Sequence, residues 1–277
     1  MRTAATDDRV RVLTLARDAG LGSGGAEVLA YEFARRIDPG QFKAYLCTTR
    51  RAVPSRTERV AQERRELEVA GIGVLALDRA SSAQVAPFAR LLTAMRREQI
   101  DILHAHMPRA SVPGTILGRL ARVPVIISHE HGSTLESKWA RKALDRNVVA
   151  RLSDALVVVS DWDRRHMIKE SGVPADRIIV LPNGIDARRP AGRNIRNALS
   201  IPEANALIAV VGRLTSQKRQ SDAIRAVAML REQGRAISCL LLGEGPDMGR
   251  LSSLVAELGL EREVHLTGNR PDVPDVL

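Results

Sequence analysis

A short apolar segment that ends at a glycine and leads into an amphipathic helix constrains this chain more than any other feature. Residues 207–211 read Leu-Ile-Ala-Val-Val, a run typical of a strand buried on both faces of a parallel sheet. Gly212 ends the run. Residues 220–231 then carry apolar side chains at helical spacing, with Ser221 or Asp222 placed to cap the first turn. The pattern predicts a strand, a glycine turn and a helix N-terminus whose free backbone N–H groups form an anion site.

Two cations lie in the loop of this predicted anion site. Arg213 follows the glycine directly, and Lys218 comes just before the helix. A forked guanidinium and a mobile ammonium together suit a diphosphate. An arbitrary pair of basic residues is as often a pair of solvated surface charges. The position at the carboxyl end of a parallel strand, where open α/β sheets bind ligands, favours the diphosphate hypothesis.

Strand-like and helix-like segments alternate along the whole chain, which predicts an α/β fold with doubly wound parallel sheets. The predicted strands are 10–16, 44–49, 73–77, 101–107, 124–128, 155–160, 178–181, 207–211, 237–242 and 263–266. The predicted helices between them include 26–36, 58–70, 85–98, 111–121, 136–151, 164–170, 220–233 and 247–258.

The strand and helix series is interrupted once. Residues 187–203 are polar and contain prolines, as expected of a linker. We therefore expect two Rossmann-like domains, an N-terminal one at 1–187 and a C-terminal one at 188–277. The second series holds three strands, half of a doubly wound sheet, so this domain is expected to be incomplete.

The formal net charge of +10 raises the question of nucleic acid as a partner. Aromatic residues make up only 3% of the chain, which leaves few platforms for stacking bases, and no nucleic-acid motif accompanies the charge. An anionic small molecule or an anionic membrane surface fits the charge better. The basic residues around Trp139 in segment 136–151 allow peripheral membrane contact, or equally an ordinary helix with a solvated basic face.

The cysteines and the N-terminus predict a cytoplasmic protein. Cys47 and Cys239 each lie in an apolar, strand-like run and are expected to be buried thiols in a reducing compartment. The first eight residues lack the apolar segment of a signal peptide, and no apolar run reaches membrane-spanning length.

A glycine cluster follows the first predicted strand. Gly20, Gly22 and Gly25 fit the Gly-x-Gly-x-x-Gly pattern of dinucleotide-binding loops. That pattern requires an acidic residue at the end of the second strand, but here the strand is followed by Arg50 and Arg51. NAD therefore fits poorly, and an NADP-linked oxidoreductase remains an alternative.

Histidines end two consecutive predicted strands. We expect His104 and His106 to face opposite sides of their strand, with His106 the one nearer a ligand. His129 and His131 bracket Glu130 at the end of the next strand. A histidine pair needs a third donor to hold a metal ion, and none is evident, so these imidazoles are expected to contact a polar ligand or to be structural.

An Asp-x-Asp sequence, Asp161 to Asp163, resembles a metal-binding motif. It also opens a predicted helix, where acidic residues are explained by capping and by the helix dipole. We interpret the two aspartates as helix-start residues and predict no metal there.

Taken as a set, eight segments resemble the glycosyltransferases of the GT-B fold, in the large retaining family 4. The likeness runs from about residue 10 to the end of the chain. The segments, in order, are 24–27, 101–106, 123–132, 157–160, 181–186, 211–218, 242–246 and 266–272.

The resemblance implies two Rossmann-like domains that face each other across a cleft, the second binding a nucleoside-diphosphate sugar and the first an acceptor. It implies that Arg213 and Lys218 hold the diphosphate and stabilise the leaving group. His131 would contact the donor sugar near the reacting carbon, with His129 as the alternative. Gly25, with Gly24, would bring its backbone to the phosphates or the acceptor.

Further roles follow from the same resemblance. Gly245, Gly268 and Arg270 would line the ribose and base pocket, and His106 and Glu27 would lie on the acceptor side. The family usually works without a divalent metal or other cofactor and transfers its sugar with retention, here in polysaccharide, glycolipid or cell-envelope synthesis. The acceptor would be a sugar or a lipid-linked sugar.

One departure from the family pattern bears on activity. The Glu-x₇-Glu element of the family is expected shortly after residue 277, and this sequence does not contain it. A truncated reading frame is therefore one interpretation. The alternative function is then a catalytically inactive protein that still binds nucleotide sugars.

Overall fold

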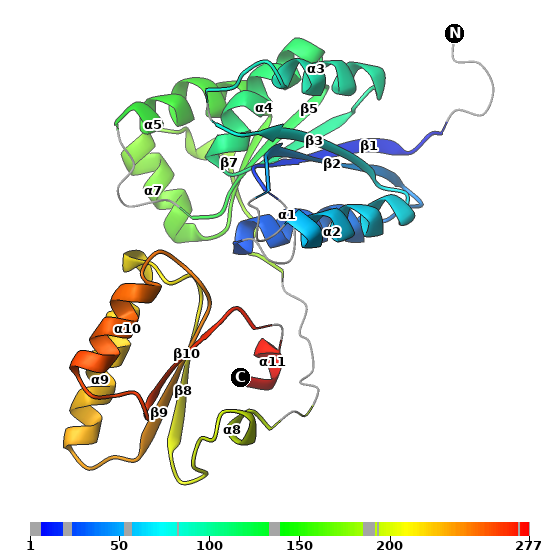
Figure 1. The fold of residues 1–277 in the computed structure, drawn as a ribbon. Helices are drawn as coiled ribbons and strands as arrows, with labels where there is room; N and C mark the ends of the chain where they lie inside the picture. The colour runs from blue at the N-terminus through cyan, green and yellow to red at the C-terminus, as the bar shows by residue number, and fades with distance from the viewer. Residues whose placement is uncertain are drawn as a thin grey trace. The chain divides into compact units, whose positions relative to one another are not determined.

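The computed structural model describes residues 7–18, 24–52, 57–81, 83–132, 139–184, 192, 194–270 and 272–276. The chain divides into two compact units, Met1–Gly184 and Ile185–Leu277. Each unit holds a sheet of parallel strands with helices on both faces (Figure 1). The predicted α/β class with Rossmann-like parallel sheets is confirmed.

The first unit is built on a seven-stranded sheet in the order β3-β2-β1-β4-β5-β6-β7, and every pair is parallel. The chain adds strands on one side of β1 and then returns to add the rest on the other side. The strand order therefore reverses between β1 and β4, the place where such sheets bind ligands. The strands are β1 Val10–Ala16, β2 Phe42–Arg50, β3 Gly73–Arg79, β4 Ile102–His106, β5 Val125–Glu130, β6 Ala155–Val158 and β7 Ile178–Val180.

Helices cover both faces of this sheet because the strands alternate between two apolar cores. Leu13 and Leu15 pack with α3 and α4 on one face, and Ala16 and Leu46 pack with α1 and α2 on the other (Figure 1). The helical segments are α1 Gly25–Arg36, α2 Thr57–Val69, α3 Phe88–Arg97, α4 Pro108–Ala121, α5 Trp139–Leu144, the π-helix Asp145–Val149, α6 Ala150–Leu152, α7 Asp161–Ser171 and the 3₁₀ turn Ala175–Arg177.

Small residues let α4 approach the centre of the sheet. A Cβ atom at Gly118 would lie 2.8 Å from Cδ1 of Ile126, and one at Gly114 would lie 2.9 Å from Cδ2 of Leu15. The glycines of this helix are therefore a packing requirement, since a side chain at either position would collide with the apolar residues of the sheet.

The second unit is built on a three-stranded parallel sheet in the order β10-β9-β8. The central strand β9 is buried along its whole length. Helices α9 and α10 pack on one face around Ile224 and Leu251, and α8 and α11 lie on the other (Figure 1). The elements are α8 Ile195–Ala198, β8 Ala206–Val211, the 3₁₀ turn Ser216–Lys218, α9 Gln220–Glu232, β9 Ile237–Leu242, α10 Met248–Glu257, β10 Val264–Gly268 and α11 Val273–Val276.

Two local predictions are wrong. Residues 195–201 are not linker: Ile195 at the start of α8 and Ile201 after it are buried against Leu240 and Leu242 of the second sheet, with Leu199 packed beside them. Segment 136–151 is not one regular α-helix. From residue 139 onward, a π-helical turn at Asp145–Val149 interrupts it.

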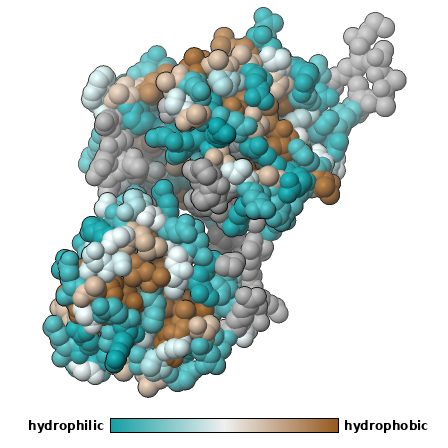
Figure 2. Space-filling view, viewed as in Figure 1, coloured by the Kyte–Doolittle hydropathy of each residue, from teal (hydrophilic) through white to brown (hydrophobic). Residues whose placement is uncertain are grey.

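The burial of the cysteines and the character of the surface agree with a globular α/β chain. Cys47 and Cys239 are buried and unpaired with each other, as predicted. On the face seen in Figure 2, each unit shows mostly hydrophilic residues, with smaller apolar patches among these residues. Within the described residues, none of the helices has the length and apolar character needed to cross a bilayer.

Candidate active site

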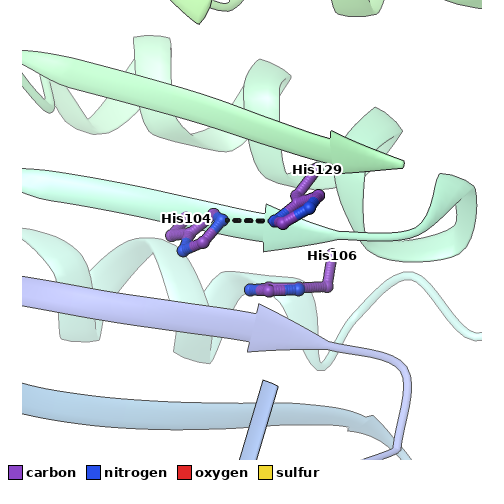
Figure 3. Close-up of side chains that lie close together, drawn as sticks. All are labelled: His104, His106 and His129. Carbon is purple, nitrogen blue, oxygen red and sulfur yellow. Dashed lines mark hydrogen bonds between the residues drawn. The ribbon is translucent and has the colours of Figure 1, made fainter. Parts of the chain in front are cut away.

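The carboxyl ends of β4 and β5 bring four histidines together. The two strands pair in parallel with His106 directly opposite His129. Nε2 of His104 lies 3.2 Å from Nδ1 of His129, and Nδ1 of His106 lies 2.9 Å from Nε2 of His131. His104, His106 and His129 are all buried (Figure 3). His104, His106, His129 and His131 are called the histidine cluster below.

The prediction that His104 and His106 face opposite sides of their strand is wrong. Residues two apart on a strand share a face, and it is Ala105 between them that points to the opposite core. The ring centroids of His104 and His106 lie 4.1 Å apart. Strand β4 therefore brings two further imidazoles beside the histidines of β5, which the sequence did not reveal.

Burial keeps these imidazoles neutral. It lowers the pKa of His104 to about 4, that of His129 to about 3 and that of His131 to about 4. The pKa of His106 falls well below its usual value for the same reason, and the neighbouring imidazoles add to the effect. At neutral pH each ring therefore has one N–H donor and one acceptor nitrogen.

Glu130 is a buried carboxylate that the sequence placed between two histidines without assigning it a role. Its Oε1 lies 3.4 Å from a guanidinium nitrogen of Arg141, which also contacts Asp145 at 2.6 Å. Burial raises the pKa of Glu130 to about 7, against the opposing charge of Arg141. Burial also raises the pKa of Asp145. One arginine thus serves two buried carboxyl groups and ties α5 and the π-turn to the end of β5, next to His131.

The start of α1 lies after β1. Gly24 precedes the helix in an extended conformation, and Gly25 is its first residue. A Cβ atom on Gly24 would lie 2.7 Å from Oε2 of Glu27, whereas none of the described residues lies within 4 Å of a Cβ built on Gly25. Gly20 and Gly22 lie outside the described residues.

Three arginines follow the carboxyl ends of neighbouring strands in the first unit. Arg17 follows β1, Arg50 ends β2, and Arg109 stands in the first turn of α4 after β4. Burial lowers the pKa of Arg17, and the charges of Arg109 and Arg50 add to this against the nearby Asp18. Arg17 forms an ion pair with Asp18 at 3.4 Å. Arg50 and Arg109 have no ion-pair partner among the described residues. Sequence reasoning had singled out only Arg50 of this basic cluster.

The helix-start interpretation of Asp161 and Asp163 is confirmed. Ser160 caps α7, its Oγ accepting a hydrogen bond from the backbone N–H of Asp163 and donating one to that residue's carboxylate. Both aspartates lie in the first helical turn.

The predicted anion site of the second unit is a loop with two exposed cations. Arg213 and Lys218 are both exposed, and neither pairs with an acidic residue in the part of the chain that the structure describes. The predicted cap at Ser221 or Asp222 is wrong. A 3₁₀ turn at Ser216–Lys218 precedes α9, which begins without a side-chain cap after a left-handed Arg219.

The loops after β8 and β9 are in backbone contact. A Cβ atom on Gly243 would lie 2.1 Å from the carbonyl oxygen of Gly212, and one on Gly245 would lie 2.1 Å from that of Leu214. The backbone N–H of Leu214 donates to the carbonyl of Glu244 at 3.0 Å. Gly245 therefore packs the two loops together, a role that the sequence did not assign to it.

The end of β10 lies at the same edge of this sheet. Gly268 has a left-handed φ of 67° and accepts a backbone hydrogen bond from Gly243. Arg270 forms a two-pronged ion pair with Asp272, at 2.9 and 2.6 Å. Within the second unit, the structure thus gathers Arg213, Lys218, Gly245 and Gly268 at one edge, while the guanidinium of Arg270 is already engaged by a carboxylate.

Solved structures with the same architecture define the class of the fold. The chain aligns over 96% of its length with Anabaena HepE in complex with UDP, at a TM-score of 0.73 and 22% identity, and covers 71% of that chain. HepE with UDP and glucose aligns at a TM-score of 0.75 and 21% identity, over 96% of this chain and 71% of that one. The fold is the GT-B fold of glycosyltransferases.

The sequence matches give the family. The profile of glycosyltransferase family 4 matches residues 23–189, and that of the glycosyl transferases group 1 matches residues 192–277. Because the first match alone spans more than half of the chain, the protein belongs to glycosyltransferase family 4. This assignment sets aside the NADP-linked oxidoreductase.

Three curated relatives have informative names. One is an Escherichia coli UDP-Gal:alpha-D-GlcNAc-diphosphoundecaprenol alpha-1,3-galactosyltransferase, 28% identical over 197 residues, 66% of this chain and 51% of the relative. Another is a Streptomyces kanamyceticus 2-deoxystreptamine glucosyltransferase, 26% identical over 203 residues, which are 66% of this chain and 52% of the relative. A third is a Corynebacterium glutamicum D-inositol 3-phosphate glycosyltransferase, 27% identical over 251 residues, which are 80% of this chain and 60% of the relative. The chain spans about half the length of the first two.

Proposed function

We propose that this protein transfers a sugar from a nucleoside-diphosphate sugar to an acceptor, with retention of configuration, in the synthesis of a cell-envelope glycan. The observation that carries the proposal is the exposed Arg213 and Lys218 pair on the loop after β8, without acidic partners among the described residues. A diphosphate leaving group gains negative charge in the transition state, and fixed cations favour that state over the ground state. The UDP complexes of the structural neighbours support a donor of this kind.

The remaining donor-side residues follow from the same proposal. The neutral ring of His131 would contact the transferred sugar, with His129 behind it, and Gly245 and Gly268 would leave backbone room for the nucleotide. Arg270 would act there only after exchanging its Asp272 partner for the ligand. Gly24, Gly25 and Glu27, with His106, would belong to the acceptor side.

The donor proposal is tested by calorimetric titration of UDP into the full chain. Replacing Arg213 and Lys218 by Ala should weaken UDP binding by on the order of 100-fold for the pair, because two charge-assisted hydrogen-bonding partners are lost. The control is Arg235→Ala, an exposed arginine just before β9 and therefore at the opposite edge of the same sheet. Unchanged UDP affinity in the double variant, or an equal loss in the control, would contradict the proposal.

Turnover distinguishes an enzyme from an inactive binding protein. The chain is incubated with a panel of UDP-, GDP- and dTDP-sugars, with and without lipid-linked acceptors, and release of nucleoside diphosphate is followed. Release or transfer identifies an enzyme, and the anomeric configuration of the product by NMR reports retention. Binding without release supports the inactive nucleotide-sugar-binding alternative.

We also propose that the acceptor carries a phosphate or diphosphate. The basic cluster of Arg17, Arg50 and Arg109 flanks the reversal in strand order between β1 and β4, where a ligand of the first unit would lie. Two of the relatives are named for phosphate-bearing compounds, a diphosphoundecaprenol and an inositol 3-phosphate. A lipid-linked diphosphate would match both the cluster and the net charge of +10.

Farnesyl diphosphate, a short lipid diphosphate, tests this acceptor proposal, with UDP in excess to occupy the donor site. Arg109→Gln and Arg50→Gln should each weaken its binding about tenfold, the value of one charge-assisted contact. Arg122→Gln is the matched control, since Arg122 is exposed and lies before β5, at the opposite edge of the sheet. Equal affinity in all three variants would exclude the cluster as the phosphate site.

A further inference from the structure

The histidine cluster holds more buried nitrogen atoms than its own hydrogen bonds satisfy. Two contacts, His104 to His129 and His106 to His131, use one nitrogen of each ring. Nε2 of His106 and Nε2 of His129 are buried and have no hydrogen-bond partner in the part of the chain that the structure describes; of the two, Nε2 of His106 is the atom that the site described below would use. Because burying a polar atom without a partner costs free energy, such atoms call for a physical explanation. His106 is 2% exposed, so bulk water does not supply the missing partner.

The geometry of three of these rings is that of a metal site. One nitrogen from each of His104, His106 and His129 lies within 4.8 Å of the others. Nε2 of His104 and Nδ1 of His129 are 3.2 Å apart. Two ligands about 2.0–2.1 Å from a tetrahedral zinc ion are about 3.4 Å apart, so this pair is already at ligand spacing. The ring of His106 lies beside this pair, on the same side of the two strands (Figure 3).

Rigid elements hold the three rings in place. His104 and His106 project from the same face of β4, and His129 lies opposite His106 on the adjacent strand β5. Phe33 of α1 packs edge-on against the His104 ring at a centroid distance of 4.9 Å. If His106 binds through its free Nε2, its Nδ1 still donates to Nε2 of His131, which fixes the orientation of both rings.

We propose that His104, His106 and His129 form a binding site for a divalent transition metal ion, with Zn²⁺ as the preferred ion. Three imidazole nitrogens without a carboxylate among them suit Zn²⁺, Co²⁺, Ni²⁺ or Cu²⁺ and do not suit Mg²⁺ or Ca²⁺. The ion would join the ends of β4 and β5 and hold His131 in position through His106. Its role is positional, and the sugar transfer proposed above passes no step through it.

The test uses the full, untagged chain, treated with a chelator and then dialysed free of it. Titration with Co²⁺ should give the intense visible absorption of a tetrahedral ion at one equivalent, and calorimetry with Zn²⁺ should show one saturable site. His104→Gln and His129→Gln should each lower the Zn²⁺ affinity by more than about 100-fold, since even partners of metal ligands cost 10–100-fold. His166→Gln is the matched control, because His166 stacks on Trp162 in α7, outside the cluster.

A measurement on the unaltered protein covers the case in which a variant fails to fold. Long-range ¹H–¹⁵N NMR of the histidine rings should show Zn²⁺-induced shifts at three rings and unchanged signals for His166. No saturable Zn²⁺ heat, a Co²⁺ spectrum that remains that of the hydrated ion, or an equal loss in the His166→Gln control would overturn the proposal. UDP affinity, measured on the same samples, tests the proposed function separately.

Discussion

In the first unit, burial lowers the pKa values of the clustered histidines and raises the pKa of a neighbouring glutamate. The four clustered histidines have lowered pKa values, about 4, 3 and 4 for His104, His129 and His131 and well below the usual value for His106. Glu130, by contrast, has its pKa raised to about 7. The unfolded chain therefore binds more protons at the histidines than the native chain does between about pH 4 and 6.5. The reverse holds at Glu130 between about pH 4.5 and 7.

These shifts predict how stability depends on pH in the absence of metal. Each buried histidine contributes stability that is present above pH 6.5 and is lost as the pH falls toward 4, up to about 2 kcal/mol per ring between pH 7 and pH 5. Glu130 opposes this, because its contribution is largest below pH 4.5 and is lost as the pH rises to 7. Since four rings outnumber one glutamate, we expect the free energy of unfolding to rise from pH 5 to pH 7.

Two variants should change this slope in opposite directions. His104→Gln removes one titrating ring and should flatten the pH dependence, whereas Glu130→Gln removes the opposing carboxyl group and should steepen it. Urea denaturation at a series of pH values, with a chelator present, measures both slopes. Identical slopes in the two variants and the wild type would show that burial does not shift these pKa values.

The positions of the candidate residues could be predicted from the sequence further than their contacts. The histidines and Arg213 stand at or just after strand ends, and Lys218 lies in the turn before α9. The functional roles of these residues stay predictions. The ion pairs of Arg141 with Glu130 and Asp145 connect the end of β5 to α5 and the π-helical turn, and no local sequence pattern encodes them. The placement of His104 was mistaken because the alternation of the strand was misapplied, although the spacing of two carried the correct answer.

At the level of elements, the start and end of each helix and strand depend on contacts that the local pattern does not show. Apolar runs located every strand, because a strand buried on both faces has few other compositions. The start of α9 at Gln220 was predicted, but its cap was not, because a 3₁₀ turn and not a capping side chain leads into the helix. The role of Gly245 was also missed, since the carbonyl that excludes a side chain there belongs to a different loop.

The contact between these loops predicts an asymmetric response to two neighbouring substitutions. Gly245→Ala would place a Cβ atom 2.1 Å from the carbonyl oxygen of Leu214 and should destabilise the protein by about 1–3 kcal/mol. Gly249→Ala, in the helix that follows, meets nothing within 4 Å and should be neutral or stabilise by up to about 1 kcal/mol through helix propensity.

Urea denaturation of the full chain compares the two, and UDP titration follows the loop that carries Arg213. Only Gly245→Ala should also lower UDP affinity, because the displaced Leu214 carbonyl belongs to that loop. Equal stability of both variants would mean that the two loops separate without cost.

For the molecule as a whole, the alternation of strands and helices predicted the α/β class and both parallel sheets. The order of the strands in space could not be read from the same pattern, because β4 could pair with β3 or return to β1 without any change in periodicity. The family assignment rests on many short segments in a fixed order, and the two profiles that match the chain follow one another along it. No single segment would have carried it.

The touching backbones after β8 and β9 also limit how such a protein can diversify. Where main chain rests on main chain, no side chain mediates the fit, so a new ligand preference has to arise elsewhere. Substitutions at the exposed positions around Arg213 and Lys218 can change which ligand is bound. Gly243 and Gly245 cannot be replaced in the same way, because a side chain at either position would collide with the neighbouring backbone. Positions that can vary with the ligand and positions that the backbone contact keeps as glycine therefore lie side by side at the same edge of the sheet.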